Sequence, residues 1–293
     1  MLDNSLVSVI IPTFNRYQVL KRAILSVVNQ DYKNIEIVIV NDASVDATSN
    51  IVKSIGDPRI KYVIHEKNKG LAAARNTGIR NSRGEYITFL DDDDEWVKEK
   101  ISLQLKVFRN NKTAGLVFTS GYSEYENDFI IEKNTASGFV YNPGVDNFFP
   151  LRILVSPPSS WMLSKQVVEE VGYFDESMYN NWDDGDYLVR TALKYPLYFL
   201  NLNLVTWHAL ANHVNMINAN LIKGKEIFLK KNFETMKNDQ EYLFRFYRTL
   251  GKDMLKLDRL KAREYLFKAL RMRFFDCATL SKIFKTYLKP KEN

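Results

Sequence analysis

The sequence contains very little cysteine and histidine. Cys277 is the only cysteine among 293 residues, so no disulfide can form within the chain, and a cytoplasmic setting is favoured. Three histidines and one cysteine are also too few to favour a structural zinc site. Any bound metal should therefore be a hard ion with oxygen ligands, such as Mn²⁺ or Mg²⁺.

Long apolar runs and the usual glycine-rich phosphate motifs are missing as well. No run reaches the roughly 18 residues of a membrane-spanning helix, and the N-terminus shows no signal-peptide pattern. Neither GxGxxG nor GxxxxGK[ST] occurs, which argues against a dinucleotide-binding fold and against a P-loop. The composition is otherwise ordinary, so we expect one large globular domain with an appendage.

Charge is distributed unevenly along the chain. Residues 216–293 contain 19 Lys and Arg against 9 Asp and Glu, a net charge of +10, so residues 1–215 carry −4 of the overall +6. The basic C-terminal region suggests an anionic partner, with a membrane surface and nucleic acid as the two alternatives.

Hydrophobic patterns predict alternating strands and helices over the first 90 residues. The predicted strands cover residues 6–11, 35–40, 60–65 and 86–90, and helical patterns lie between them, at 16–30, after 46 and from 69. This alternation favours right-handed crossovers and a mostly parallel sheet flanked by helices.

Small or polar residues follow these strands. They are Thr13 and Asn15 after the first strand, Asp42 and Ser44 after the second, and Asp91 to Asp94 after the last. Because the carboxyl ends of parallel strands meet at one edge, where α/β proteins bind ligands, we expect a nucleotide site there. Asp42 could bind a base or ribose and Arg75 a phosphate. An Asx turn and a surface charge are the simpler alternatives for these two residues.

Four consecutive aspartates are the most unusual feature of the sequence. Adjacent carboxylates repel one another and are costly to desolvate, so Asp91 to Asp94 need either a cation or a solvated surface. The alternative is a solvated acidic loop or a helix N-terminus, because the sequence looks helical from Trp96 onward.

Four blocks of sequence then occur in order along the chain. They are VSVIIPTFNR (7–16), IEIVIVNDASVDAT (35–48), NKGLAAARNTGI (68–79) and GEYITFLDDDDEW (84–96). Together they resemble the nucleotide-binding half of inverting family 2 glycosyltransferases, and the likeness continues more loosely over 167–176 and 182–190. The resemblance implies a GT-A (Rossmann-like) catalytic domain over 1–215, with a nucleotide-binding half (1–120) and an acceptor half (121–215). A basic helical region would follow over 216–293.

The resemblance also implies a role for each matching residue on the donor side. Pro12, Thr13 and Asn15 would border the nucleotide, and Asp42 would bind the base, usually uracil. Arg75 and Asn76 would line the base and phosphates. Asp91 and Asp92 would lie by the ribose, and Asp93 would coordinate the metal. The metal would offset the negative charge of the diphosphate leaving group. Asn41 departs from the family, which more often has a second aspartate there. Because four aspartates are consecutive, the family motif can be aligned on them in more than one way, and Asp91 is the alternative metal ligand.

On the acceptor side, the resemblance assigns the catalytic base to Asp184, with Asp183 in place of the more usual Glu. A base is required because a sugar hydroxyl is a poor nucleophile until its proton is being removed. Three acids capping the helix that follows are the alternative explanation of the same residues.

The segment 207–213 matches the family poorly. Many relatives carry an Arg and a His beside the phosphates here, but Leu210 stands where that His is commonest. His208 and His213 are therefore candidates for diphosphate or metal contact, with packing or surface roles as the alternative.

Between these segments, the pattern predicts loops and edge strands over 121–158. The aromatic residues there are either sugar platforms or local packing. A short strand is predicted over 159–163, a helix over 165–171 and a strand over 198–205.

Beyond residue 216, apolar residues recur at helical spacing among basic ones, which predicts several amphipathic helices. The simpler expectation is that they pack on each other or on the catalytic domain. The alternative is peripheral contact with the anionic inner face of the cell membrane, where a lipid-linked acceptor resides. Nucleic acid is not expected as a partner, because no aromatic-basic RNA motif occurs.

These observations predict a metal-dependent, inverting glycosyltransferase. It would move a sugar from a nucleotide-sugar, most simply a UDP-sugar, to a hydroxyl of a glycan or lipid-linked acceptor in the synthesis of a cell-surface polysaccharide or glycoconjugate. One alternative is a non-catalytic glycan or nucleotide binder on the same scaffold. A nucleotidyltransferase is another, although its usual glycine-rich basic loop near the N-terminus is missing.

Overall fold

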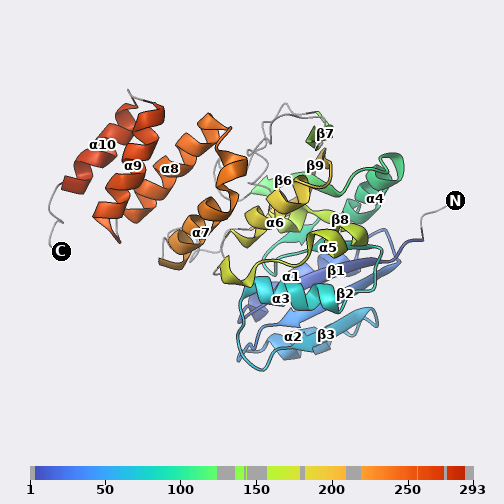
Figure 1. Ribbon diagram of the computed structural model, residues 1–293. Coiled ribbons are helices and arrows are strands. Elements are labelled where there is room, and N and C mark those ends of the chain that lie inside the picture. The colour runs from blue at the N-terminus through green and yellow to red at the C-terminus, as the bar shows by residue number, and fades with distance from the viewer. Residues whose placement is uncertain are drawn as a thin grey trace.

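The computed structural model describes residues 4–123, 136–141, 143, 157–178, 182–208, 219–255, 257–273 and 276–287. An α/β body holds a nine-stranded sheet, and the C-terminal helices extend from one side of this body (Figure 1). Along its main path the sheet has the order β3-β2-β1-β4-β8-β6-β9-β5, with β7 pairing to β9. The predicted α/β class, with a mostly parallel sheet flanked by helices, is confirmed.

The first half of the body is a βαβαβαβ unit, as the hydrophobic pattern predicted. Its elements are β1 (Val7–Thr13), α1 (Tyr17–Val28), β2 (Ile35–Asn41), α2 (Thr48–Ile55), β3 (Ile60–Ile64), α3 (Leu71–Arg80) and β4 (Tyr86–Phe89). All the strand pairs within this unit are parallel, with Val7 opposite both Ile35 and Tyr86. Every residue of β1 and β2 is buried, which explains why both strands are continuous apolar runs.

The second half of the body makes the sheet mixed. It contains β5 (Glu95–Trp96), α4 (Lys100–Asn110), β6 (Leu116–Ser123), β7 (Gly138–Tyr141), β8 (Met162–Ser164), α5 (Lys165–Val171), α6 (Asp183–Ala192) and β9 (Leu197–Trp207). Strand β8 runs antiparallel between β4 and β6, whereas β6 and β9 are parallel.

Three predictions for this half need correction. The helix expected from Trp96 begins only at Lys100, because Trp96 pairs with β9. The strand expected over 159–163 lies at Met162–Ser164, after a 3₁₀ turn over Pro158–Ser160. Strand β6 was not predicted, and it extends into the region assigned to loops and edge strands; most of 121–158 lies outside the described residues.

Alternate residues of β1 enter different cores on the two faces of the sheet. Val9 and Ile11 pack with α1, α2 and α4, whereas Ile10 packs with α3, α5 and α6. Gly78 lets α3 approach β1 closely, because a Cβ atom at this position would lie 2.3 Å from Cγ2 of Ile10. This close packing brings the N-terminus of α3 to the carboxyl edge of the sheet.

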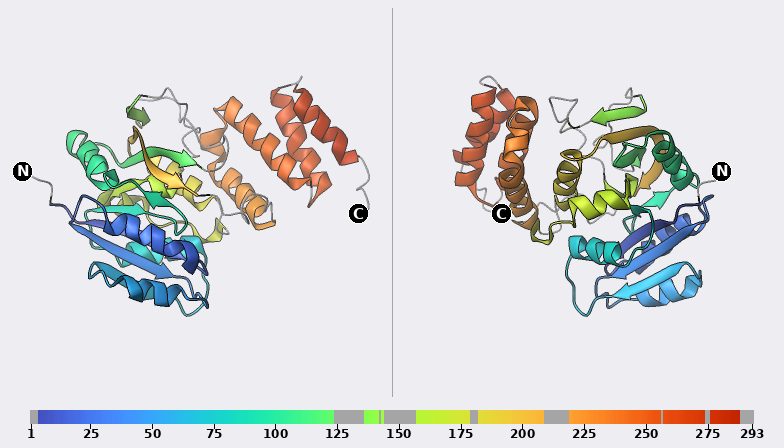
Figure 2. Two further views of the ribbon diagram at one scale, coloured as in Figure 1. Left: turned by 180° about the vertical axis from the view of Figure 1, so that it is seen from behind. Right: turned by 45° about the vertical axis from the view of Figure 1, so that its right-hand side comes forward.

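The core beside α3 continues without interruption into the C-terminal helices. These are α7 (Ala219–Met236), α8 (Gln240–Met254), α9 (Arg259–Met272) and α10 (Cys277–Tyr287). Trp182, at the head of α6, packs on Phe228 of α7 and Phe246 of α8, with ring centroids 5.0 and 5.2 Å away. Helices α8, α9 and α10 pack in succession, and α10 is the outermost (Figure 2). No helix in the described part of the chain is long and apolar enough to cross a membrane.

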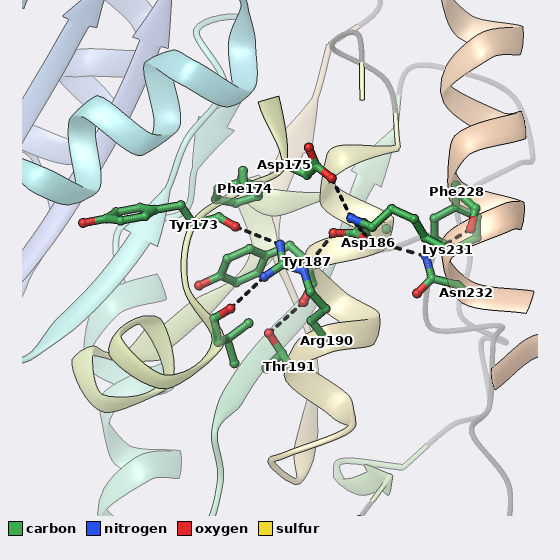
Figure 3. A network of polar contacts seen from close by, with 12 residues as sticks. Tyr173, Phe174, Asp175, Asp186, Tyr187, Arg190, Thr191, Phe228, Lys231 and Asn232 are labelled. Atoms are coloured by element: carbon green, nitrogen blue, oxygen red, sulfur yellow. Dashed lines mark hydrogen bonds and ion pairs between the residues drawn. The ribbon is translucent and has the colours of Figure 1, made fainter. Parts of the chain in front are cut away.

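A polar network beside these aromatic contacts fastens α6 to α7 (Figure 3). Asp186 of α6 is fully buried, and its carboxylate lies 2.8 Å from Arg190 and 2.9 Å from Lys231 of α7. Lys231 also contacts Asp175, at 2.6 Å. The Arg190 guanidinium donates to the backbone oxygens of Val171 and Tyr173. One buried carboxylate therefore joins α6, α7 and the segment before α6.

We predict that Asp186→Leu destabilises the protein by about 3 kcal/mol, because Arg190 and Lys231 lose the carboxylate they share. Urea unfolding measures this change. The matched control is Glu264→Leu, which removes an exposed helix carboxylate paired with Lys268 and should cost less than about 0.5 kcal/mol. Equal losses in the two variants would contradict the role given to Asp186.

Candidate active site

A cleft of about 450 Å³ lies at the carboxyl edge of the parallel strands. The loop after β1, the end of β2, the start of α3 and the loop after β4 form its walls, as the topology predicted. The lining residues are Pro12, Thr13, Phe14, Arg16, Asp42, Asn68, Gly70, Leu71, Ala74, Asp91, Asp92 and Asp93.

Asp42 lies in this cleft, and most of its hydrogen-bonding capacity is already used. Its Oδ1 lies 2.6 Å from Nδ1 of His65 and accepts the backbone N–H of Lys69 at 2.8 Å. Its Oδ2 accepts the backbone N–H of Gly70, also at 2.8 Å. A carboxylate offers about four acceptor positions, so Oδ2 retains one for a ligand. These bonds also anchor the N-terminus of α3 to the end of β2.

The loop after β1 is held by reciprocal contacts with the loop after β2. The backbone N–H of Asn15 donates to the Ser44 hydroxyl, and the Asn15 side-chain oxygen accepts the backbone N–H of Val45. Asn15 and Ala43 both have positive φ, at 53° and 64°, a strained conformation that is common at binding sites. Pro12 and Thr13 line the cleft. Asn15 does not, and instead supports the loop.

The four aspartates separate into two groups. Asp91, Asp92 and Asp93 line the cleft, whereas Asp94 turns inward, where Ser159 donates a hydrogen bond to it at 2.5 Å. Burial raises the pKa of Asp94 well above its usual range. Burial also raises the pKa of Asp92 to about 6, although the positive charge of Arg16 opposes this shift.

Arg75 is the buried centre of the site and does not lie on the cleft wall. Its guanidinium donates to Asp91 at 2.9 Å and to Asp183 at 3.0 Å, and its side chain is 3% exposed. Burial alone would lower the pKa of Arg75, but Asp91 and Asp183 outweigh it and raise the pKa. The phosphate contact expected for Arg75 stays a prediction, and in this structure its two Nη atoms bind carboxylates.

Arg16 is a second cation of the site, and sequence analysis gave it no role. It stands just before α1 and lines the cleft. One nitrogen, Nη1, lies 2.9 Å from the Asp92 carboxylate and 2.8 Å from the Asp93 carboxylate. Arg22 contacts the same motif differently, donating to the backbone oxygen of Asp93. The sequence signal was an arginine directly after a strand-end loop, which only the fold could relate to the aspartates.

Asp184 lies in the first turn of α6, next to the Asp183 that pairs with Arg75. Burial, together with the charges of Asp183 and Asp91, raises the pKa of Asp184 to about 6, and Arg75 opposes this shift. Asp184 is partly exposed to solvent. A carboxylate with this pKa is suited to accept a proton near neutral pH. Arg75 and Asp91 thus link Asp184 electrostatically to the cleft.

Two other predicted residues are placed differently from expectation. Asn76 is buried and is not among the residues that line the cleft; its side-chain amide bonds the backbone of Phe174 and the Glu176 carboxylate. His208 lies 3.5 Å from Glu95 of β5, near the aspartate motif but off the cleft wall. His213 and Leu210 lie outside the described residues.

The cleft carboxylates fit a Mn²⁺ or Mg²⁺ ion in chemistry, because such ions prefer hard oxygen ligands. Within the described ranges, no three His, Cys, Asp or Glu side chains gather into a ready-made metal cage. An ion held by one or two carboxylates, with its shell completed by phosphates and water, is consistent with this arrangement.

Comparison with known proteins gives a family match and several relatives. The model of the family described as Glycosyl transferase family 2 matches residues 8–172. A putative colanic acid biosynthesis glycosyl transferase, WcaA of Escherichia coli K12, is 40% identical over 42% of this chain and 44% of its own length. The chain therefore spans less than half of that relative. The UDP-Glc:alpha-D-GlcNAc-diphosphoundecaprenol beta-1,3-glucosyltransferase WfaP of E. coli is 34% identical over 78% of this chain and 84% of its length.

Solved structures share the fold. TarS of S. aureus has a TM-score of 0.71 and 17% identity, covering 96% of this chain and 54% of that one. A TarS structure in complex with UDP-GlcNAc has a TM-score of 0.66 and 15% identity, covering 96% of this chain and 89% of that one. A mannosyltransferase of Pyrobaculum calidifontis, in complex with GDP-Man and Mn²⁺, has a TM-score of 0.59 and 17% identity, covering 96% and 85%. At these identities the likeness concerns the fold alone.

We predict that Arg75→Met destabilises the protein by about 3–5 kcal/mol, because Asp91 and Asp183 would be left without their buried counterion. Adding Asp183→Asn to this variant should recover about 1–3 kcal/mol, since one of the orphaned charges is then removed. Urea unfolding of the two single variants and the double variant measures this coupling.

The control for Arg75 is Arg80→Met, one turn further along α3. Arg80 is half exposed and lies 3.8 Å from Glu176, so its loss should cost less than about 1 kcal/mol. Additive effects of Arg75→Met and Asp183→Asn would contradict a pairing that stabilises the site.

Proposed function

The chain belongs to glycosyl transferase family 2, and from this premise we propose that it transfers a sugar from a UDP-sugar to a hydroxyl of a lipid-linked glycan acceptor. The observation that supports this most is the convergence of three carboxylates. Asp42 and Asp93 line one cleft, and Arg75 ties Asp91 of that cleft to Asp183, the residue directly before Asp184. The names of two relatives, one in colanic acid biosynthesis and one using UDP-Glc and a diphosphoundecaprenol-linked acceptor, support surface polysaccharide synthesis as the setting.

We assign donor recognition to the wall of the cleft between β1, β2 and α3. The free acceptor position on Oδ2 of Asp42 suits the ring N–H of uracil. Pro12 and Thr13 border the nucleotide, and Asp91 and Asp92 lie on the ribose side. Asp93 would help to hold Mn²⁺ or Mg²⁺, and such an ion offsets the charge that gathers on the diphosphate leaving group.

In the proposed reaction, Asp184 accepts the proton of the acceptor hydroxyl while that oxygen attacks the anomeric carbon. The attack comes from the face opposite the diphosphate, so one displacement inverts the anomeric configuration and no covalent glycosyl-enzyme forms. The pKa of Asp184, about 6, leaves the carboxylate ionised at neutral pH and still basic enough to take the proton.

A transfer assay tests this function: UDP release from UDP-sugars, with Mn²⁺ and a GlcNAc-diphospho-lipid acceptor. We expect acceptor-dependent UDP release with inverted product. Because ionised Asp184 is the active form, kcat/KM should fall about tenfold per pH unit below about 6. Asp184→Asn should lower kcat at least about 100-fold and abolish the fall in kcat/KM at acidic pH.

The control for Asp184 is Asp258→Asn, at the N-cap of α9. Asn preserves the cap, and the site is remote from the cleft, so kcat should not change. Uptake of UDP-sugar without any UDP release would instead indicate a non-catalytic binder. Full activity of Asp184→Asn would remove the assigned base.

We further propose that the C-terminal helices bring the enzyme to an anionic membrane surface, where a lipid-linked acceptor is anchored. Residues 259–287 contain eight Lys and Arg against two Asp and Glu. The outermost helix, α10, exposes Leu280, Phe284 and Tyr287 at a spacing that places them on one face. Basic charge combined with exposed apolar side chains is the pattern of interfacial helices.

Vesicle flotation tests this attachment. The protein should bind vesicles containing phosphatidylglycerol, bind less at high salt, and ignore pure phosphatidylcholine. Phe284→Glu should weaken binding about tenfold or more, whereas Leu202→Glu on β9, also exposed, should not. Equal binding by the two variants, or concentration-dependent dimerisation that Phe284→Glu abolishes, would contradict membrane docking.

A further inference from the structure

Arg16 bridges Asp92 and Asp93, a contact for which neither donor binding nor proton transfer, as proposed, gives a reason. A single guanidinium nitrogen contacts the carboxylates of both Asp92 and Asp93, at 2.9 and 2.8 Å. Both aspartates face the cleft, and so does Arg16 itself. A cation held by two carboxylates at the wall of a ligand cleft occupies the kind of position that a divalent ion would otherwise take.

Charge explains why these carboxylates need a partner before any ligand arrives. Asp91 to Asp94 follow one another without an intervening residue. Arg75 balances Asp91, and Ser159 donates to Asp94, which leaves Asp92 and Asp93 adjacent in the cleft. Their mutual repulsion in a partly desolvated wall would be costly without a positive charge between them.

We propose that Arg16 is an internal counterion that holds Asp92 and Asp93 until a nucleoside diphosphate draws its guanidinium away and frees Asp93 for the divalent ion. This inference rests on the proposed function, because it takes the diphosphate and the ion as ligands of the same cleft. It assigns to Arg16 a positioning role that orders the binding of the two ligands.

Competition for the same oxygens gives this proposal its physical basis. A guanidinium bound to a carboxylate disfavours a divalent ion on the same carboxylate, because the two positive charges repel and the guanidinium already uses one acceptor position. Ion binding therefore carries a penalty while Arg16 remains in place. A diphosphate offers the guanidinium two phosphate groups, with which Arg pairs strongly. Nucleotide and ion should consequently each raise the affinity for the other.

The decisive measurement is Mn²⁺ affinity in the absence of nucleotide, followed by electron paramagnetic resonance of free Mn²⁺. We expect Arg16→Met to bind Mn²⁺ about 10-fold or more tightly than the wild-type protein, since its carboxylates are no longer occupied. Adding Asp93→Asn to Arg16→Met should remove the gain. Arg16→Gln, which keeps a donor without the charge, gives the same test if Arg16→Met does not fold.

Arg22→Met is the matched control, because it tests the effect on Mn²⁺ affinity of losing a nearby positive charge alone. Arg22 donates to the backbone oxygen of Asp93 and does not contact its carboxylate, so this change removes the same charge without releasing a ligand oxygen. We expect a gain in Mn²⁺ affinity below about 3-fold. Equal gains in the Arg16 and Arg22 variants, or no gain in Arg16→Met, would overturn the counterion role.

A second experiment tests whether the Arg16 guanidinium moves to the diphosphate. It measures nucleotide binding by calorimetry in the presence of EDTA. Arg16→Met should weaken UDP binding about 10-fold and leave uridine, which has no phosphates, unchanged. An equal loss for UDP and uridine, or no loss for either, would overturn this step. Failure of the wild-type protein to bind UDP would count against the proposed function, whereas the nucleotide-free Mn²⁺ comparison decides the role of Arg16 separately.

Discussion

The ion pairs of Arg75 are the interaction on which the candidate site depends. Two segments about 90 residues apart deliver Asp91 and Asp183, and one buried guanidinium holds both at hydrogen-bonding distance. Without that charge, the acids at the head of α6 would repel those after β4. The positive charge of Arg75 also limits how far burial raises the pKa of Asp184. The structural ion pairs therefore also adjust the pKa of the proposed base.

The C-terminal helices complete this arrangement and are not a separate attachment. Trp182 immediately precedes Asp183 and Asp184, and it packs on Phe228 and on Phe246. Two residues later, Asp186 is tied to Lys231 of the same helix α7. The first turn of α6 is therefore held both by Arg75 and by α7, so the position of Asp184 depends on both.

Local pattern explains what could be predicted from the sequence. The buried strands β1 and β2 and the helices between them follow from periodicity, and the polar strand ends follow from parallel topology. Strand β6 escaped prediction because its pairing with β8 and β9 depends on distant residues. The carboxylate contacts of Arg16 and Arg75 were not predicted for the same reason. Each contacts carboxylates that only the folded chain brings within reach, and the bonds of the Asn76 amide to Phe174 likewise depend on a distant segment.

The most direct test of the account is a crystal structure of the protein with UDP and Mn²⁺. We expect uracil against Asp42, the ion on Asp93, and Asp184 facing the open side of the diphosphate, with Arg75 still between Asp91 and Asp183. UDP bound outside this cleft, or an ion held far from Asp93, would contradict the convergence of carboxylates on which the account is built.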